Sequence, residues 1–185
     1  MEISKTSLEG LLIIKPDVFS DERGYFYESF SATEFQENNI ETNFVQDNIS
    51  KSYKGTIRGL HYQVGDKAQG KLSHVLSGKV LDVAVDLRLN SSTFGKYFSI
   101  ELSDENHLQL WIPVGFAHGF SVLSDIVIFQ YKCTNFYNKE YEQAILYSDP
   151  ILNIDWRVDN PIVSPRDLKA KPFQESEKEM FFFSV

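Results

Sequence analysis

Two histidines stand in short segments whose residue types suit acid–base chemistry. His61 lies in RGLHYQ at 58–63, and His118 follows a Pro-x-Gly turn in QLWIPVGFAHGF at 109–120. The first segment places His61 on a short strand beside an arginine, and the second returns the chain to the mouth of a small antiparallel barrel. An imidazole with an unperturbed pKa of about 6.5 is a good general base at neutral pH. These segments therefore predict proton-transfer chemistry at one end of a β-barrel.

Alternating apolar and polar residues indicate the strands that must position these groups. In VLDVAVDL at 80–87, the odd-numbered residues share one strand face, and Asp82 and Asp86 share the other. Further strands are expected over 71–76, 97–102, 116–123 and 126–132, separated by Gly, Ser, Asn and Asp turns. Many short strands at this spacing predict a sandwich or barrel.

The remaining segments add little regular structure. A short helix is expected at about 32–38, because Ser31 and Glu34 make a capping box and Phe35 gives an apolar anchor. The tail after Pro161, including Phe181–Phe183, is expected to be irregular or to form short helices packed on the barrel. We find no repeat, low-complexity tract or linker, so residues 1–185 are expected to form a single domain.

Composition excludes several classes of function. The net charge of −8 argues against a nucleic-acid binder, and an anionic substrate would need a local basic cluster. No apolar stretch reaches the roughly 20 residues that span a bilayer, so we expect no membrane partner. The single cysteine, Cys133, is expected to be a buried, inert thiol. Because the N-terminus also lacks the pattern of a signal peptide, we expect a cytoplasmic protein.

Several long motifs resemble one family of nucleotide-sugar epimerases. The segments containing His61 and His118 closely resemble those of the dTDP-4-dehydrorhamnose 3,5-epimerase family, and the resemblance extends from FSDERG at 19–24 to SPRD at 164–167. It implies an all-β fold, a double-stranded β-helix or cupin-type jelly roll with short peripheral helices. It also implies catalysis without a cofactor, in a homodimer whose N-terminal strands reach the neighbouring subunit.

A metal centre is the main alternative chemistry for a barrel of this type. Metal-binding cupins supply two histidines one residue apart, then an acid and a later histidine. Here the sequence His61-Tyr62-Gln63 offers one imidazole where two are needed, so with His118 the ligand set is incomplete. We therefore expect no metal and no cofactor.

The resemblance implies a base and an acid for the reaction. The family pairs its histidine with an aspartate that corresponds to Asp167, although many relatives read Ser-Glu-Lys-Asp where this chain reads SPRD at 164–167. A carboxylate on the second ring nitrogen fixes the tautomer of His61 and stabilises the imidazolium. Tyr131 matches the tyrosine that the family uses as general acid, and a phenol with an unperturbed pKa near 10 can donate a proton at pH 7.

Two further polar groups are expected to support the reaction. Lys71 is predicted to stabilise the negative charge that an enolate places on the former ketone oxygen. Asp82 could orient Lys71 or His61, or it could only satisfy backbone donors. His118 is expected to contact the substrate or a residue that does, and a structural role for it stays open.

The diphosphate of a nucleotide sugar calls for the forked donors of arginine, and Arg58 and Arg23 are the candidates. Strict alternation places Arg58 on the strand face opposite His61, so Arg58 reaches the same pocket only if Gly59 distorts the strand. By resemblance, the other nucleotide contacts are Gln46, Asn48 and the aromatic Tyr137. Equivalents of Phe19, Arg23 and Glu28 come from or near the partner's strands in the family.

The resemblance implies an epimerase that acts at C3 and C5 of dTDP-4-dehydro-6-deoxy-D-glucose. The product would be dTDP-4-dehydro-L-rhamnose, a precursor of cell-surface polysaccharide. One alternative keeps the fold and base but epimerises a single carbon, or isomerises the ketone, of a related nucleotide sugar. Another is a non-catalytic sugar-binding cupin, which would have no reason to keep His61, Tyr131 and Asp167 together.

Overall fold

Two six-stranded sheets form the body of the molecule, and all of their strand pairs are antiparallel except that of β14 with β6. The structure, a computed structural model, describes residues 1–179. The first sheet has the order β1 (Glu2–Lys5), β2 (Leu12–Lys15), β10 (Gln109–Ile112), β7 (Lys71–Ser77), β12 (Ile126–Cys133) and β5 (Gln46–Tyr53). The path of the second sheet is β13 (Glu142–Ala144), β6 (Thr56–Gln63), β11 (Phe116–Val122), β8 (Lys79–Asp86) and β9 (Tyr97–Ser103), and β14 (Ile162–Val163) pairs with β6 in parallel.

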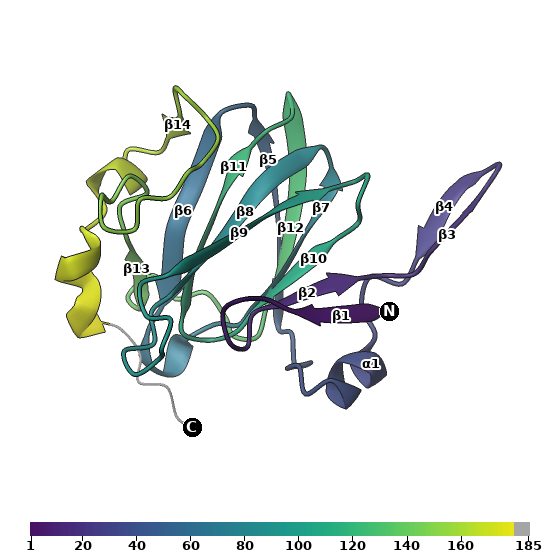
Figure 1. Cartoon of the computed structure of the whole chain (residues 1–185), viewed down its shortest axis with the longest axis horizontal. Coiled ribbons are helices and arrows are strands. Elements are labelled where there is room, and N and C mark those ends of the chain that lie inside the picture. The colour runs from purple at the N-terminus through teal and green to yellow at the C-terminus, as the bar shows by residue number, and fades with distance from the viewer. Residues whose placement is uncertain (180–185) are drawn as a thin grey trace.

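The chain passes repeatedly from one sheet to the other, as Figure 1 shows. Strands β5, β7, β10 and β12 belong to the first sheet, and β6, β8, β9 and β11 belong to the second. This order is that of a jelly roll, and it confirms the predicted all-β cupin-type fold. All the strands expected from the alternation pattern are present, with ends that differ from the prediction by one residue.

Both faces of the central strands are buried, because apolar clusters lie on each side of the second sheet. One cluster fills the space between the sheets, with Phe129 from the first sheet and Phe120 from the second. A second cluster contains the odd-numbered residues of β8, from Leu81 to Val85, and the tail residues Trp156 and Phe173. The tail after β13 therefore covers the face of β8 that turns away from the first sheet. The odd-numbered residues of β8 share this face, as the alternation pattern predicts.

Short elements surround the two sheets. Strands β3 (Val18–Asp21) and β4 (Gly24–Tyr27) form a hairpin that projects from the body in Figure 1. The helix α1 covers Ala32–Glu37, and 3-10 turns cover Gly65–Lys67, Asp167–Lys169 and Phe173–Glu179. The tail after Pro161 thus has the predicted short helical turns, but it begins with the strand β14, which was not predicted. Phe181–Phe183 lie outside the described residues. No helix in residues 1–179 is long and apolar enough to cross a bilayer.

The predicted capping box of α1 is wrong. Ser31 has an extended backbone at the N-cap position, but its side chain makes no capping hydrogen bond. The carboxylate of Glu34 lies 3.6 Å from the terminal amino group of Met1. An ion pair with the N-terminus therefore takes the place of the reciprocal bond to Ser31 that a capping box requires.

Candidate functional site

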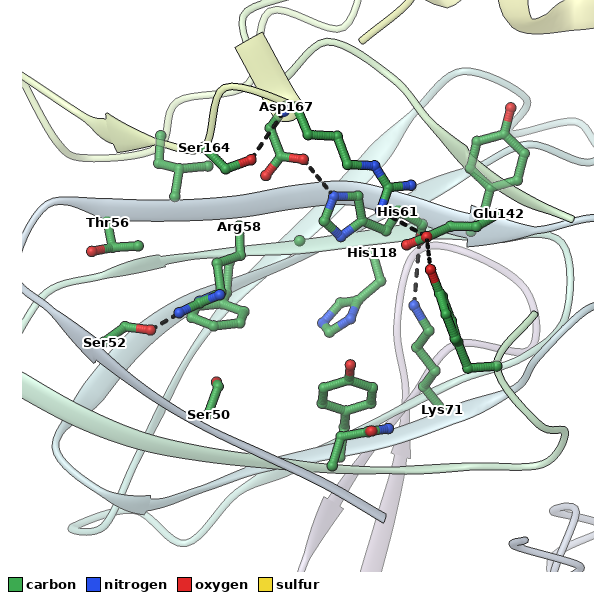
Figure 2. Close-up of a pocket in the computed structure, with 18 of the residues that line it drawn as sticks. Ser50, Ser52, Thr56, Arg58, His61, Lys71, His118, Glu142, Ser164 and Asp167 are labelled. Atoms are coloured by element: carbon green, nitrogen blue, oxygen red, sulfur yellow. Dashed lines mark hydrogen bonds and ion pairs between the residues drawn. The ribbon is translucent and has the colours of Figure 1, made fainter. Parts of the chain in front are cut away.

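Side chains from both sheets line a pocket of about 740 Å³. Strands β5, β7 and β12 contribute from the first sheet, and β6 and β11 contribute from the second. Residues of the segments 137–142 and 162–167 complete the lining. Figure 2 shows His61, Arg58 and His118 directed into the same space as Lys71.

His61 and Asp167 form a hydrogen-bonded pair in this pocket. Nε2 of His61, on β6, lies 2.7 Å from Oδ1 of Asp167, and the backbone N–H of Asp167 donates to the hydroxyl of Ser164 at 3.1 Å. Burial opposes ionisation of Asp167, yet the hydrogen bond and the charge of His61 hold the pKa of Asp167 below its usual value. An ionised Asp167 only accepts hydrogen bonds, so Nε2 of His61 carries a proton, and in the neutral form of the ring Nδ1 is the free base.

A β-bulge in β6 brings Arg58 to the same pocket as His61. In the register with β11, His61 pairs with His118 and Arg58 pairs with Phe120, so β6 has one more residue than β11 between these pairs. Gly59 has a φ of +130°, and a Cβ there would lie 2.5 Å from Cα of Gly119. The distortion that Arg58 requires is therefore present, and Nε of Arg58 donates to the hydroxyl of Ser52 at 2.9 Å.

Lys71 and Tyr131 enter the pocket from the first sheet. Nζ of Lys71 donates to the backbone carbonyl of His61 at 3.3 Å and lies 5.8 Å from the centroid of the Tyr131 ring. Burial lowers the pKa of Lys71, although nearby negative groups oppose this shift. Burial, helped by the charges of Cys133 and Glu142, raises the pKa of Tyr131 to about 12. Tyr131 therefore holds its proton firmly at neutral pH.

Cys133 is buried at the end of the same strand, as predicted. Burial raises the pKa of its thiol, so little thiolate is present at neutral pH.

Asp82 makes no hydrogen bond with Lys71 or His61, contrary to the prediction that it could orient one of them by direct contact. Its Oδ1 lies 2.6 Å from Nε2 of His118, and its Oδ2 accepts a hydrogen bond from the hydroxyl of Ser73 at 2.6 Å. The reason is the strand order, because β11 lies between β8 and β6 and places His118 between Asp82 and His61. His118 lines the pocket and is 6% exposed.

The predicted nucleotide contacts gather at another part of the pocket. Nε2 of Gln46 donates to Oδ1 of Asn48 at 2.9 Å, and the backbone N–H of Tyr137 donates to Oε1 of Gln46 at 2.8 Å. The Tyr137 hydroxyl donates to Oε2 of Glu142 at 2.7 Å, and the side chain is 51% exposed. A half-exposed aromatic ring at the pocket offers a flat surface on which a base can stack.

Glu142 and Arg166 also line the pocket, and our sequence reasoning missed both. Nη1 of Arg166 lies 2.7 Å from Oε2 of Glu142, which also accepts the Tyr137 hydroxyl. The three-residue strand β13 that carries Glu142 is too short for a periodicity signal, and Arg166 attracted notice only as a departure from the family motif. By contrast, the pocket hydroxyls of Ser50 and Ser52 could have been found, because they continue the alternation of Gln46 and Asn48 along β5.

Phe19, Arg23 and Glu28 do not line this pocket in the single chain. Phe19 and Arg23 belong to the β3–β4 hairpin and its turn, where the Phe19 side chain is 66% exposed and Arg23 forms an ion pair with Asp21. Glu28 and Phe19 border a smaller hollow beside the terminal amino group. Any contact of these residues with a ligand in the large pocket must therefore come from a second copy or from a movement of the hairpin.

Both pocket histidines already have carboxylate partners, Asp167 for His61 and Asp82 for His118. Within residues 1–179, no three His, Cys, Asp or Glu side chains are grouped as a metal site would require.

Comparisons with known proteins agree with this geometry. The family model described as dTDP-4-dehydrorhamnose 3,5-epimerase matches residues 5–175. A protein of that name from Shigella flexneri is 52% identical, in an alignment that covers 96% of this chain and 98% of the relative. Another, from Methanothermobacter thermautotrophicus, is also 52% identical, and its alignment covers 93% of this chain and 94% of the relative. The crystal structure of a dTDP-6-deoxy-D-glucose-3,5-epimerase from Legionella pneumophila, in complex with dTDP-4-keto-L-rhamnose, superposes with a TM-score of 0.95 at 48% identity, covering 100% of this chain and 99% of the other. The chain therefore belongs to the dTDP-4-dehydrorhamnose 3,5-epimerase family of isomerases.

Proposed function

We propose that this chain converts dTDP-4-dehydro-6-deoxy-D-glucose to dTDP-4-dehydro-L-rhamnose by inverting C3 and C5, within one domain that spans residues 1–185. The observation that carries the proposal is the placement of the two proton-transfer groups. His61 enters the pocket from β6 of the second sheet, and Tyr131 enters it from β12 of the first. Inversion requires removal of a proton on one face of the sugar and delivery on the other, which a base and an acid on two walls can provide.

His61 is the base for both carbons, which flank the C4 ketone. Its free ring nitrogen takes the proton from C3 or C5, and the electron pair of the broken C–H bond moves to the ketone oxygen to give an enolate. Asp167, 2.7 Å from the other nitrogen, stabilises the imidazolium that forms. Lys71 stabilises the enolate oxygen, because a cation in a water-poor site favours negative charge there.

Tyr131 returns a proton to the opposite face. Because its pKa is raised to about 12, the phenol is protonated before the reaction. Protonation of the enolate carbon by Tyr131 restores the ketone with inverted configuration and leaves a tyrosinate, which the nearby charge of Lys71 favours. Proton exchange with solvent then returns His61 and Tyr131 to their starting states.

The nucleotide part of the substrate is held by Arg58 at the diphosphate and by Gln46, Asn48 and Tyr137. In this proposal the enzyme is a cytoplasmic homodimer, and Phe19, Arg23 and Glu28 of one subunit complete the site of the other. The exposed Phe19 and Phe26 on the projecting hairpin support this arrangement, since large exposed apolar side chains often mark an interface. The Legionella pneumophila relative binds dTDP-4-keto-L-rhamnose, which supports a nucleotide sugar as ligand.

Proton NMR of the 4-keto sugar nucleotide in deuterated water tests the proposal. The expected result is deuterium at both C3 and C5. Deuterium at one carbon would instead indicate a single-carbon epimerase or a ketoisomerase, and its absence from both would indicate a non-catalytic sugar-binding protein. His61→Ala should lower the exchange rate by roughly 10²–10⁴-fold while nucleotide binding stays within a few-fold. Near-normal exchange in that variant would contradict the role of His61.

We also propose that the reaction needs no metal or cofactor. The protein should keep full activity after extensive chelation, and elemental analysis should find no stoichiometric metal. One tightly bound transition metal per chain, with activity lost on its removal, would overturn this part of the proposal.

A further inference from the structure

A buried chain of hydrogen bonds connects the first sheet to the pocket histidine of the second. The hydroxyl of Ser73, on β7, donates to Oδ2 of Asp82 at 2.6 Å, and Nε2 of His118 lies 2.6 Å from Oδ1 of the same carboxylate. Ser73 and Asp82 are both 0% exposed. Of these three hydrogen-bonded residues, only His118 lines the pocket. Figure 2 shows it below His61 and between Arg58 and Lys71.

In the first sheet, Ser73 is next to residues that line the pocket although it does not line the pocket itself. In the strand register it lies opposite Tyr131 of β12 on one side and Leu110 of β10 on the other. One residue separates it from Lys71 along β7, so both side chains are on the same face of the strand. Ser73 is therefore adjacent in the sheet to two proposed reaction groups, yet its hydroxyl is used to bind Asp82.

The carboxylate of Asp82 needs both of its donors. A buried carboxylate is costly unless each oxygen accepts a hydrogen bond, and here His118 serves Oδ1 while Ser73 serves Oδ2. Because an ionised carboxylate only accepts, the hydrogen bond to Asp82 places a proton on Nε2 of His118, and the Nε2–H tautomer of the ring presents Nδ1 as an acceptor. Without the Ser73 hydroxyl, Oδ2 would have no side-chain donor among residues 1–179, and the carboxylate would be free to rotate.

We propose that Ser73 is a positioning residue whose hydroxyl fixes the Asp82 carboxylate and thereby holds His118 in the Nε2–H tautomer. His118 then accepts a hydrogen bond at Nδ1 from a hydroxyl group of the bound sugar. The second statement rests on the proposed function, since it requires a sugar in the pocket. The first concerns the free protein alone.

A pair of isosteric substitutions tests the role of the hydroxyl. Ser73→Thr keeps the hydroxyl. Ser73→Val introduces a side chain of nearly the same shape as threonine, with a methyl group in place of the hydroxyl. We expect kcat/KM for epimerisation to stay within a few-fold of wild type in the Thr variant and to fall about tenfold or more in the Val variant. Equal kcat/KM in the two folded variants would overturn the proposal.

Ser121 offers a matched control, because it is also 0% exposed and its hydroxyl donates to the backbone carbonyl of Trp156 at 2.6 Å. The Ser121→Thr and Ser121→Val pair should differ in melting temperature but not in kcat/KM beyond about twofold. An equal loss of kcat/KM in Ser73→Val and Ser121→Val would show that any buried hydroxyl has this effect, which would contradict a specific role for Ser73.

Nitrogen-15 NMR of the His118 ring in the substrate-free protein separates this proposal from the proposed function. Wild type and Ser73→Thr should show the Nε2–H tautomer, and Ser73→Val should show a mixed or changed tautomer. If Ser73→Val does not fold, Ser73→Ala is the smaller change that gives the same comparison. An unchanged Nε2–H tautomer in the folded Val or Ala variant would overturn the role of Ser73, even if wild type proved inactive on the sugar nucleotide.

Discussion

Burial shifts the pKa values of the two residues that enter the pocket from the first sheet in opposite directions. It raises the pKa of Tyr131 to about 12 and lowers the pKa of Lys71, because in each case the neutral form is favoured away from water. The carboxylate of Asp167 is also buried, yet its hydrogen bond with His61 keeps it ionised. The pocket thus combines a protonated phenol with an oriented imidazole, which are the two states that the proposed reaction needs.

A second buried histidine gives a pH prediction that is independent of the pocket. His74, on β7, is 6% exposed, and burial together with the charge of Lys132 lowers its pKa to about 4. In the unfolded chain its pKa is about 6.5, so between these values the unfolded state binds more protons. The stability that neutral His74 contributes is therefore complete above pH 6.5 and is lost as the pH falls toward 4.

We expect His74→Gln to weaken this pH dependence. Between pH 7 and pH 4, the free energy of unfolding of wild type should fall by up to about 3 kcal/mol more than that of the variant. Urea unfolding of both proteins at several pH values measures the difference. The same pH dependence in the two proteins would contradict a lowered pKa for His74.

The grouping of the proposed reaction residues could be predicted from the sequence, because each lies in a motif that resembles the family. His61, Asp167, Lys71 and Tyr131 all reach one region of the molecule through segments far apart in the chain. The partner of Asp82 could not be predicted, since alternation gives the face of a strand but not the strand that lies beside it.

At the scale of elements, the alternation of residues predicts strands well and their irregularities poorly. The five strands expected in the middle of the chain are present, because apolar residues at a period of two need a buried sheet face. The sequence showed only that Arg58 could reach the pocket if Gly59 distorted β6. It could not predict the bulge itself, because the close contact of Gly59 with β11 is a tertiary feature. The capping box failed for a similar reason, since the ion pair of Glu34 with Met1 brings together distant parts of the chain.

Gly59→Ala tests whether the bulge depends on close contact with β11. A Cβ at Gly59 would meet Cα of Gly119 at 2.5 Å and the carbonyl oxygen of His118 at 2.9 Å, in a backbone conformation with φ of +130°. We expect a loss of about 2–4 kcal/mol in the free energy of unfolding, from steric overlap and backbone strain together. Thermal or urea unfolding measures the loss.

Gly24 separates these two contributions. Its φ is +122°, but a Cβ there would have no neighbour within 4 Å. Gly24→Ala should therefore carry only the conformational cost, and Gly59→Ala should be clearly more destabilising. Equal losses in the two variants would show that contact with β11 does not matter.

At the scale of the whole molecule, the β3–β4 hairpin is the part that a single chain leaves unexplained. It projects from the body and carries exposed aromatic side chains, including Phe19 and Phe26. Packing on a second copy of the chain would bury these aromatic side chains. In a twofold dimer, each hairpin would then contribute residues to the other subunit's pocket.

Complementation between two inactive variants tests this exchange of hairpins. Arg23→Glu should damage the site to which the hairpin contributes, and His61→Ala should inactivate the site of its own chain. A mixed dimer would then contain one site with both defects and one site with neither, so unfolding and refolding an equal mixture should restore up to about a quarter of wild-type activity. No recovery, with mixed dimers shown to be present, would place Arg23 and His61 in the same site of one chain.

The central claim, that His61 and Tyr131 act on opposite faces of the sugar, is tested most directly by Tyr131→Phe in deuterated water. This variant loses only the hydroxyl, and Tyr147→Phe, a partly buried tyrosine of the second core cluster, is the matched control. Proton NMR of one sample reports both deuterium incorporation and configuration at C3 and C5. We predict that Tyr131→Phe exchanges deuterium without inversion at one or both carbons, because His61 still forms the enolate and the proton returns to the face it left. Inversion of both carbons at close to the wild-type rate would contradict the account.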